Sequence, residues 1–459
     1  MNGLVLARLI QQRSTTPVVL LDSAPSTGGL FQSSSYPGYG LYDQGVHIFQ
    51  DTGVEEVENI IRSSLGQDDW QDLGGFRREI AGLFFNGRLQ TNTAFLDLRY
   101  HKDRDALFGG MLNSLNQNSL TDPAELSFSK IITEKFGTPI LRTVIGPIVE
   151  GIYGRPADQL QKLATTLTPF HRVVFFDEKN MPDLMLSDSI RARLGYPEQK
   201  NLPSKYSSGL GSYYPKKFGL QKVVDNLTAS ILASGGEIRL NTKISNIDLA
   251  SRRIETIAFE QHGASHILEN IDQCMWTAAL PSLFFALGGG KAGSVENDMA
   301  PQTWILNLAF SQKPAMADLY FLYSYLENGN AFRISNPLNY SECFGETVGK
   351  YFPLCVEAVF PADNKMNTAD MKIKLIGELD QMGISPKDAV VFSDLRRLPT
   401  GVPMPTLANA KGIAKMRDFI SEKKCENIFP VGIQSEPDLF YYRDILRYSY
   451  QKIVEVYGI

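Results

Sequence analysis

The sequence is poor in cysteine and has no long apolar run, and each shortage excludes a class of protein. No C-x-x-C pair and no stretch of about 18 apolar residues occurs. We therefore expect no disulfide scaffold, no zinc site, no transmembrane helix and no signal peptide, and we expect a reducing compartment such as the cytoplasm. The cysteines that do occur in the 459 residues are Cys274, Cys343, Cys355 and Cys425.

The sequence also lacks a basic surplus and the common hydrolase and phosphate-binding motifs. Lys+Arg 45 against Asp+Glu 50 gives a net charge of -5, which disfavours nucleic acid as a partner. No H-E-x-x-H, G-x-S-x-G or P-loop motif appears. His262 and His266 are four residues apart across a predicted turn, without a third ligand, so no metal site is expected.

The first 22 residues have the pattern of the second half of a βαβ dinucleotide-binding unit. Residues 4–10 have the spacing of an amphipathic helix, and residues 18–21 form an apolar strand that ends on Asp22. An acidic residue at this point binds a ribose hydroxyl, and Gly3 supplies the last glycine of G-x-G-x-x-G. The first strand and the first two glycines are missing, so we expect Met1 to be an internal methionine of a longer protein.

A glycine pair and a histidine-bearing block follow the acidic strand end. Gly28 and Gly29 let the backbone approach a pyrophosphate or flavin ring, and "YDQGVHIF" occupies residues 42–49. This order resembles the FAD-dependent amine oxidases, protoporphyrinogen oxidases and UDP-galactopyranose mutases, which carry a D-x-G-x-H-x-F block beside the flavin. The resemblance implies FAD as cofactor and places His47 next to the ring as a catalytic residue, with a core histidine as the alternative.

Two later segments resemble the same family. Residues 213–248 match its "YPxGG…GxxIxLNTxVxxI" segment, and residues 425–459 match its last strand and helix, although Ile433 replaces the usual arginine after the strand. Lys217 and Phe218 stand where the family has the second glycine before the helix. By this resemblance the cofactor-binding residues are Gly3, Asp22, Gly28, Gly29, Ile244, Gly432 and Asp444.

The order of helical and strand patterns predicts an α/β fold with interleaved domains. A Rossmann-like FAD-binding domain alternates with a substrate domain that has a mixed sheet, a helical insertion and α+β character. The Asn86-Gly87 pair predicts a hairpin, and the alternation from Ile238 through Leu240 to Ile244 predicts a single strand. The FAD-binding domain is expected over residues 1–75, 209–290 and 396–459, and the substrate domain over 76–208 and 291–395.

Arg333, in "NAFRISNPLNYS", matches an arginine that binds the substrate diphosphate in the mutases, so it is a candidate catalytic and substrate-binding residue. A guanidinium is well suited to phosphate or carboxylate. The alternative is an ion pair with Glu357 on a neighbouring strand. Tyr441 and Tyr442 are candidate substrate contacts, with aromatic packing under the last helix as their alternative.

Taken together, these motifs predict an FAD-dependent oxidoreductase that transfers a hydride from a small-molecule substrate to flavin N5. One alternative is a UDP-galactopyranose mutase-like enzyme acting on a nucleotide sugar, supported by the histidine block, by Arg333 and by residues 441–444. Another is a flavin-free homologue with a binding role, supported by the missing glycines and by Ile433.

Overall fold

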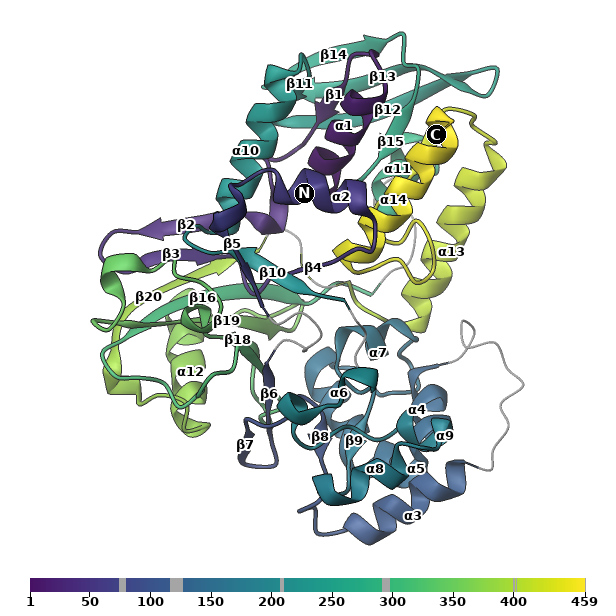
Figure 1. Ribbon diagram of the computed structural model, residues 1–459. Helices are drawn as coiled ribbons and strands as arrows, with labels where there is room; N and C mark the ends of the chain where they lie inside the picture. The colour runs from purple at the N-terminus through teal and green to yellow at the C-terminus, as the bar shows by residue number, and fades with distance from the viewer. Residues whose placement is uncertain are drawn as a thin grey trace.

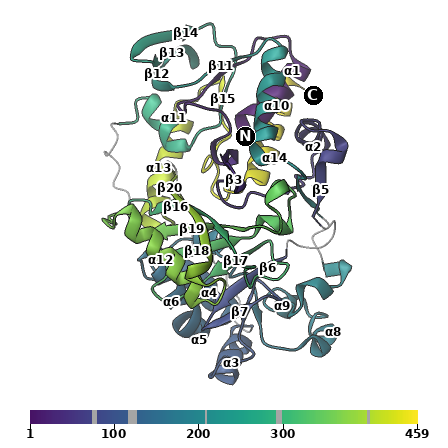
Figure 2. The ribbon, with the colours of Figure 1, turned by 90° about the vertical axis from the view of Figure 1, so that its left-hand side faces the viewer.

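The computed structural model describes residues 1–73, 80–115, 127–206, 210–290, 298–398, 401 and 403–458. Figure 1 shows three parts from top to bottom: an α/β part that holds both ends of the chain, a broad sheet, and a helical part. Figure 2 shows the same order in the perpendicular view. The chain passes from the first part into the others and returns twice, so the parts are interleaved along the sequence.

Helices and short parallel strands build the α/β part: α1 (Asn2–Arg13), β1 (Val19–Leu21), α10 (Leu220–Ala233), β11 (Glu237–Arg239), β15 (Cys274–Trp276), β21 (Ile428–Pro430) and α14 (Tyr442–Tyr457). β1 pairs in parallel with β11, and β15 with β21. The apolar face of α1 is buried, and the helix packs against α10 and α14. The helix and strand predicted over the first 22 residues are confirmed.

Seven strands form the broad sheet, in the order β20 (Val390–Arg397), β16 (Gln302–Phe310), β19 (Phe352–Phe360), β18 (Ala331–Ser335), β17 (Phe321–Ser324), β6 (Ala81–Phe85) and β7 (Arg88–Gln90). β17 and β6 run parallel and the other neighbours antiparallel, so the predicted mixed sheet is confirmed. The β6–β7 hairpin turns at Asn86 and Gly87, whose φ angles are 50° and 69°. α12 (Thr368–Gln381) buries Met371 and Leu375 in the core beside this sheet.

The helical part contains α3 (Arg104–Ser114), α4 (Phe128–Phe136), α5 (Thr138–Ile140), α6 (Gly146–Tyr153), α7 (Leu163–Leu167), α8 (Met181–Leu184) and α9 (Asp188–Arg191), with the short strands β8 (Leu96–Asp97) and β9 (Val173–Val174). It has its own apolar core, in which Phe128, Phe136 and Phe175 are almost fully buried. The predicted helical insertion is confirmed over its described residues.

The other helices and strands include β2 (Ser33–Tyr36), β3 (Gly40–Asp43), β4 (Phe49–Gln50), α2 (Glu55–Arg62), β5 (Trp70–Asp72), β10 (Ser212–Pro215), β12 (Thr242–Ala250), β13 (Arg253–Gln261), β14 (Ala264–Glu269), α11 (Leu280–Ala286) and α13 (Leu407–Glu422). β10 lies between β4 and β5, and β12 to β14 form a separate antiparallel sheet. Among the described residues, no helix has both the length and the apolarity needed to cross a membrane.

One predicted strand is wrong in its extent. The alternation that begins at Ile238 predicts a single strand, but the structure divides it into β11 and β12 at Asn241, whose φ is 53°. This left-handed conformation turns the chain, so β11 pairs with β1 whereas β12 pairs with β13. The predicted domain boundaries after residues 75 and 208 lie outside the described residues, and the five-segment division stays a prediction.

Candidate functional site

The amino end of α1 lies close to the strands of the α/β part. A Cβ on Gly3 would lie 3.2 Å from Leu20 Cδ2 and 3.5 Å from Thr277 Oγ1, so glycine permits close helix–strand packing. That is the role of the third glycine in a dinucleotide-binding motif. No side chain caps α1, and the buried Asn2 Oδ1 has no hydrogen-bond partner among the described residues. The amino end of α1 therefore leaves backbone N–H groups of its first turn, and the Asn2 side-chain oxygen, available to a ligand.

Asp22 and Ile244 lie on adjoining elements. The carbonyl of Asp22 accepts a hydrogen bond from Thr242 N at 2.8 Å, two residues before Ile244. The Asp22 side chain is exposed at the end of β1, and its Oδ1 accepts a bond from Ala24 N at 2.9 Å. The Ile244 side chain packs with Leu21 on the core under β12. Asp22 thus presents a carboxylate to solvent, whereas Ile244 contributes mainly to packing.

The glycine pair leads directly into an aromatic cluster. Gly28 and Gly29 have φ angles of 105° and 58°, and a Cβ on Gly28 would lie 2.9 Å from Val224 on α10. The turn carries the chain to Phe31, whose ring stacks on His47 with 5.5 Å between centroids. Phe31 also meets the edge of Tyr442 at 5.6 Å. The structure therefore brings the glycine pair, His47 and Tyr442 into one neighbourhood.

His47 is an uncharged ring in this cluster at neutral pH. Burial lowers the pKa of His47, and the charge of Arg333 acts in the same direction, while Glu357 opposes it. The ring Nε2 lies 3.1 Å from the carbonyl oxygen of Gln44, which fixes its orientation. A neutral imidazole has one donor and one acceptor nitrogen, so His47 can orient a neighbouring polar group without adding charge.

Arg333 forms the ion pair that was its alternative interpretation. Its Nε and Nη2 donate to the two carboxylate oxygens of Glu357, each at 2.6 Å. Glu357 Oε1 also accepts a bond from Val46 N at 3.0 Å, so the pair holds the residue before His47 against the sheet. Burial acts to lower the pKa of Arg333, but Glu357 and the Tyr323 hydroxyl raise it above its ordinary value. The substrate-binding role of Arg333 stays a prediction.

Several tyrosines surround the same end of the sheet. Tyr323 lies opposite Arg333 on the neighbouring strand. Burial raises the pKa of Tyr153 of α6, and the nearby Tyr441 and Tyr323 add to the shift. Burial raises the pKa of Tyr441 to about 12, and Tyr323 adds to the shift. The buried hydroxyl of Tyr325 has no hydrogen-bond partner among the described residues. Tyr153, Tyr325 and Tyr441 therefore give the site hydroxyl groups that remain protonated at neutral pH.

The amino end of α14 closes the site from the α/β part. Tyr442 opens the helix, and its hydroxyl bonds the backbone of Gln50. Tyr441 donates to the carbonyl of Thr166 in the helical part. Asp444 pairs with the adjacent Arg443 at 3.2 Å and lies in the first helical turn, where a carboxylate is favourable. Tyr441 and Tyr442 therefore have structural contacts of their own, in line with their alternative interpretation.

The predicted substrate and catalytic residues lie near one another, whereas Gly432 has a packing role elsewhere. His47, Arg333, Tyr441 and Tyr442 lie together, through the contacts described above. Gly432 belongs with the strands, since a Cβ there would collide with the carbonyl of Ala278. Within the described part of the chain, no group of three or more His, Cys, Asp or Glu side chains is arranged to hold a metal ion.

Sequence reasoning missed several residues of the site, namely Phe31, Tyr153, Tyr323 and Tyr325. Only the alternation in "FLYSYL" gave a signal, because Phe321, Tyr323 and Tyr325 share one face of a strand. Glu357 was foreseen as the partner of Arg333, but its bond to Val46 depends on how the sheet meets the α/β part.

Comparison with known proteins supports this organisation. The family described as "NAD(P)-binding Rossmann-like domain" matches residues 1–63. A search among curated proteins gave no match. Among solved structures, reduced UDP-galactopyranose mutase is similar over 100% of this chain and 92% of its own, with a TM-score of 0.71 and 15% identity.

Two further structures agree. A putative protoporphyrinogen oxidase from Exiguobacterium sp. 255-15 is similar over 100% of this chain and 96% of its own, with a TM-score of 0.66 and 14% identity. A putrescine oxidase variant is similar over 100% and 97%, with a TM-score of 0.59 and 11% identity. The predicted resemblance is confirmed in fold: the chain has the fold shared by these mutases and oxidases, and its residues 1–63 match the Rossmann-like family model.

Proposed function

We propose that the chain is an FAD-dependent oxidoreductase of the amine oxidase and protoporphyrinogen oxidase type, acting on a small molecule. One observation carries the proposal: Phe31, which directly follows the Gly28–Gly29 turn, stacks on His47, and the Arg333–Glu357 pair holds the residue before His47. A segment with the dinucleotide-binding pattern is thereby joined to a cluster of aromatic and polar side chains at the sheet.

The residues at the dinucleotide-binding end fit FAD. The uncapped amino end of α1, with Gly3 and the unpartnered Asn2 Oδ1, offers donors for a pyrophosphate and an acceptor for a hydroxyl. The exposed carboxylate of Asp22 fits a ribose hydroxyl. When bound, FAD would supply a hydride acceptor. Gly29, at which a Cβ would meet no described atom within 4 Å, leaves space for the backbone to approach it, and α14 brings the favourable end of its dipole.

The chain's own residues would bind and orient the substrate. His47 and Phe31 present an uncharged stacked surface that excludes water from one side. Tyr325 has a buried hydroxyl ready to hydrogen-bond a substrate group. Arg333 is already neutralised by Glu357, so it would position a polar substrate more than it would attract an anion. This neutralised pair favours the oxidoreductase over the mutase.

The test is an absorbance spectrum of the purified protein after incubation with FAD and removal of free flavin. Retained bands near ~375 and ~450 nm are expected for protein-bound flavin. Asp22→Ala should retain less flavin, because it removes the ribose acceptor, whereas Asp272→Ala, an exposed carboxylate on another loop, should match the native protein. Absence of the bands from the native protein would overturn the proposal in favour of a flavin-free binding protein.

A nucleotide-sugar mutase is the second candidate, and the tyrosines around Arg333 support it. Tyrosine hydroxyls and a guanidinium are common phosphate ligands. The dithionite-reduced protein should then convert UDP-galactofuranose, and Arg333→Ala should abolish UDP-sugar binding. No conversion of UDP-galactofuranose, together with unchanged UDP-sugar binding in Arg333→Ala, would leave the oxidoreductase as the better proposal.

A further inference from the structure

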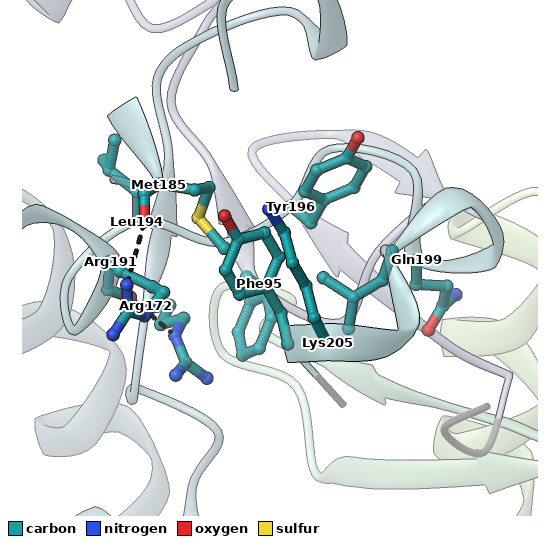
Figure 3. Close-up of a pocket in the computed structure, with 10 residues that line it drawn as sticks. Phe95, Arg172, Met185, Arg191, Leu194, Tyr196, Gln199 and Lys205 are labelled. Carbon is teal, nitrogen blue, oxygen red and sulfur yellow. Dashed lines mark hydrogen bonds between the residues drawn. The ribbon is translucent and has the colours of Figure 1, made fainter. Parts of the chain in front are cut away.

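The helical part contains a pocket that the proposed active site does not use. It has a volume of about 310 Å³ and is lined by Phe95, directly before β8, and by residues between Arg172 and Tyr206. That volume lies near the lower limit for small-molecule sites in proteins. Figure 3 shows Arg172 and Arg191 on one side of the pocket, Tyr196 on the other, and Lys205 between them. None of the predicted cofactor or substrate residues lines it.

The charge of the pocket wall is positive. Arg172, Arg191 and Lys205 line it, and none of the described lining residues is acidic. Arg191 pairs with Asp188, whose side chain is 86% exposed and directed to solvent, so this carboxylate offsets only part of the charge. Lys205 has no ion-pair partner among the described residues and lies 4.8 Å from the centre of the Tyr206 ring.

A second layer of cations lies behind this wall. Arg193 donates its Nε to the carbonyl of Lys135 at 2.7 Å, and its guanidinium is bonded to backbone carbonyls. Burial lowers the pKa of Lys135 to about 8, and the charges of Arg172 and Arg193 add to the shift. Burial is the larger cause of this pKa shift, and the smaller part that comes from the two arginines reflects a local positive potential that an anion would relieve.

The rest of the wall is aromatic and apolar except for Gln199, whose side chain is hydrogen-bonded to the backbone of Ala81. Phe95, Tyr196 and Tyr206 line the pocket, together with apolar side chains of the same segment. The guanidinium of Arg191 lies 5.7 Å from the centre of the Tyr206 ring, so the cations and the rings share one surface. A flat ring would contact the aromatic side chains while its anionic group reached Lys205 and the arginines.

We propose that this pocket binds a small aromatic ligand that carries a phosphate or carboxylate group, at a site distinct from the FAD and substrate site. The ring supplies apolar burial and stacking, and the anion forms charge-assisted hydrogen bonds with the cationic wall. The site lies in the insertion rather than in the part of the chain that matches the dinucleotide-binding family, so it can act as an effector site.

The test is a calorimetric titration of the full chain with 1-naphthyl phosphate and 1-naphthoate, beside 1-naphthol and inorganic phosphate. The two aromatic anions should bind at least roughly tenfold more tightly than either control, since a charge-assisted hydrogen bond contributes about one such factor. Their relative affinity shows which anionic group the site prefers. Binding of 1-naphthol as tight as that of both anions would overturn the proposal, as would no binding at all.

Variants locate the binding. Lys205→Met keeps the apolar stem and removes the charge, and it should weaken the anions roughly three- to tenfold. Lys179→Met makes the same change at an exposed residue of the insertion that does not line the pocket, and it should have no effect. Equal loss in both variants would contradict the proposal.

A second pair guards against misfolding and against binding elsewhere. Tyr206→Leu should weaken the aromatic anions without changing their preference over 1-naphthol. Tyr441→Phe, at the proposed substrate site, should leave the titration unchanged. Loss in Tyr441→Phe alone would place the binding at the active site and overturn the inference.

Discussion

The ion pair between Arg333 and Glu357 is expected to stabilise the fold because each partner compensates the buried charge of the other through two hydrogen bonds. Both nitrogen–oxygen distances are 2.6 Å, and the side chains are 22% and 14% exposed. Removing one partner leaves the other charge buried, which typically costs about 3–5 kcal/mol. Glutamine keeps one acceptor oxygen, so we expect Glu357→Gln to lower the free energy of unfolding by about 2–4 kcal/mol.

A double-mutant cycle separates the pair from its surroundings. Arg333→Met and Glu357→Leu should each cost at least a similar amount, whereas the double variant Arg333→Met, Glu357→Leu should recover much of the loss, because no buried charge remains. Unfolding is followed in denaturant by tryptophan fluorescence, to which Trp304 of the same sheet contributes.

The matched control is another bidentate pair at the surface. Arg239 donates to Glu237 at 2.7 and 3.1 Å, with 28% and 51% of the two side chains exposed. Water screens this pair, so Arg239→Met should cost less than about 1 kcal/mol. Equal losses in Arg239→Met and Glu357→Gln, or additive effects in the cycle, would refute the reasoning.

Three further predictions concern buried groups. Burial raises the pKa of Asp43 to about 6, against the bonds it accepts, so the folded state holds its proton more tightly and stability should fall by roughly 2–4 kcal/mol as pH rises from about 4 to 6; Asp43→Asn should flatten this slope in unfolding measured against pH. Gly432→Ala should lower the melting temperature because its Cβ meets the carbonyl of Ala278, whereas Gly151→Ala, in open space on a helix, should not. Tyr325→Phe should leave stability unchanged or raise it by about 1 kcal/mol, since it removes an unpartnered hydroxyl, and impaired turnover in that variant would mark a substrate contact.

Local chemistry made much of the fold predictable. The apolar spacing of residues 4–10 is enough for an amphipathic helix, and Asn86-Gly87 is enough for a tight hairpin, because both depend on neighbours in sequence. The strand that begins at Ile238 was predicted too long because the prediction used only neighbours in sequence. Alternation continues through Asn241, but only strand pairing reveals the turn there.

The site shows where local information ends. The sequence by itself determined the dinucleotide-binding pattern, with Gly3, Asp22 and the glycine pair at fixed spacing, because that pattern is read along one short segment. Only the tertiary structure decided that Arg333 pairs with Glu357, since a side-chain partner 24 positions away is set by strand register. It also placed Phe31 on His47 and left the Tyr325 hydroxyl buried, because these contacts join segments that no local preference brings together.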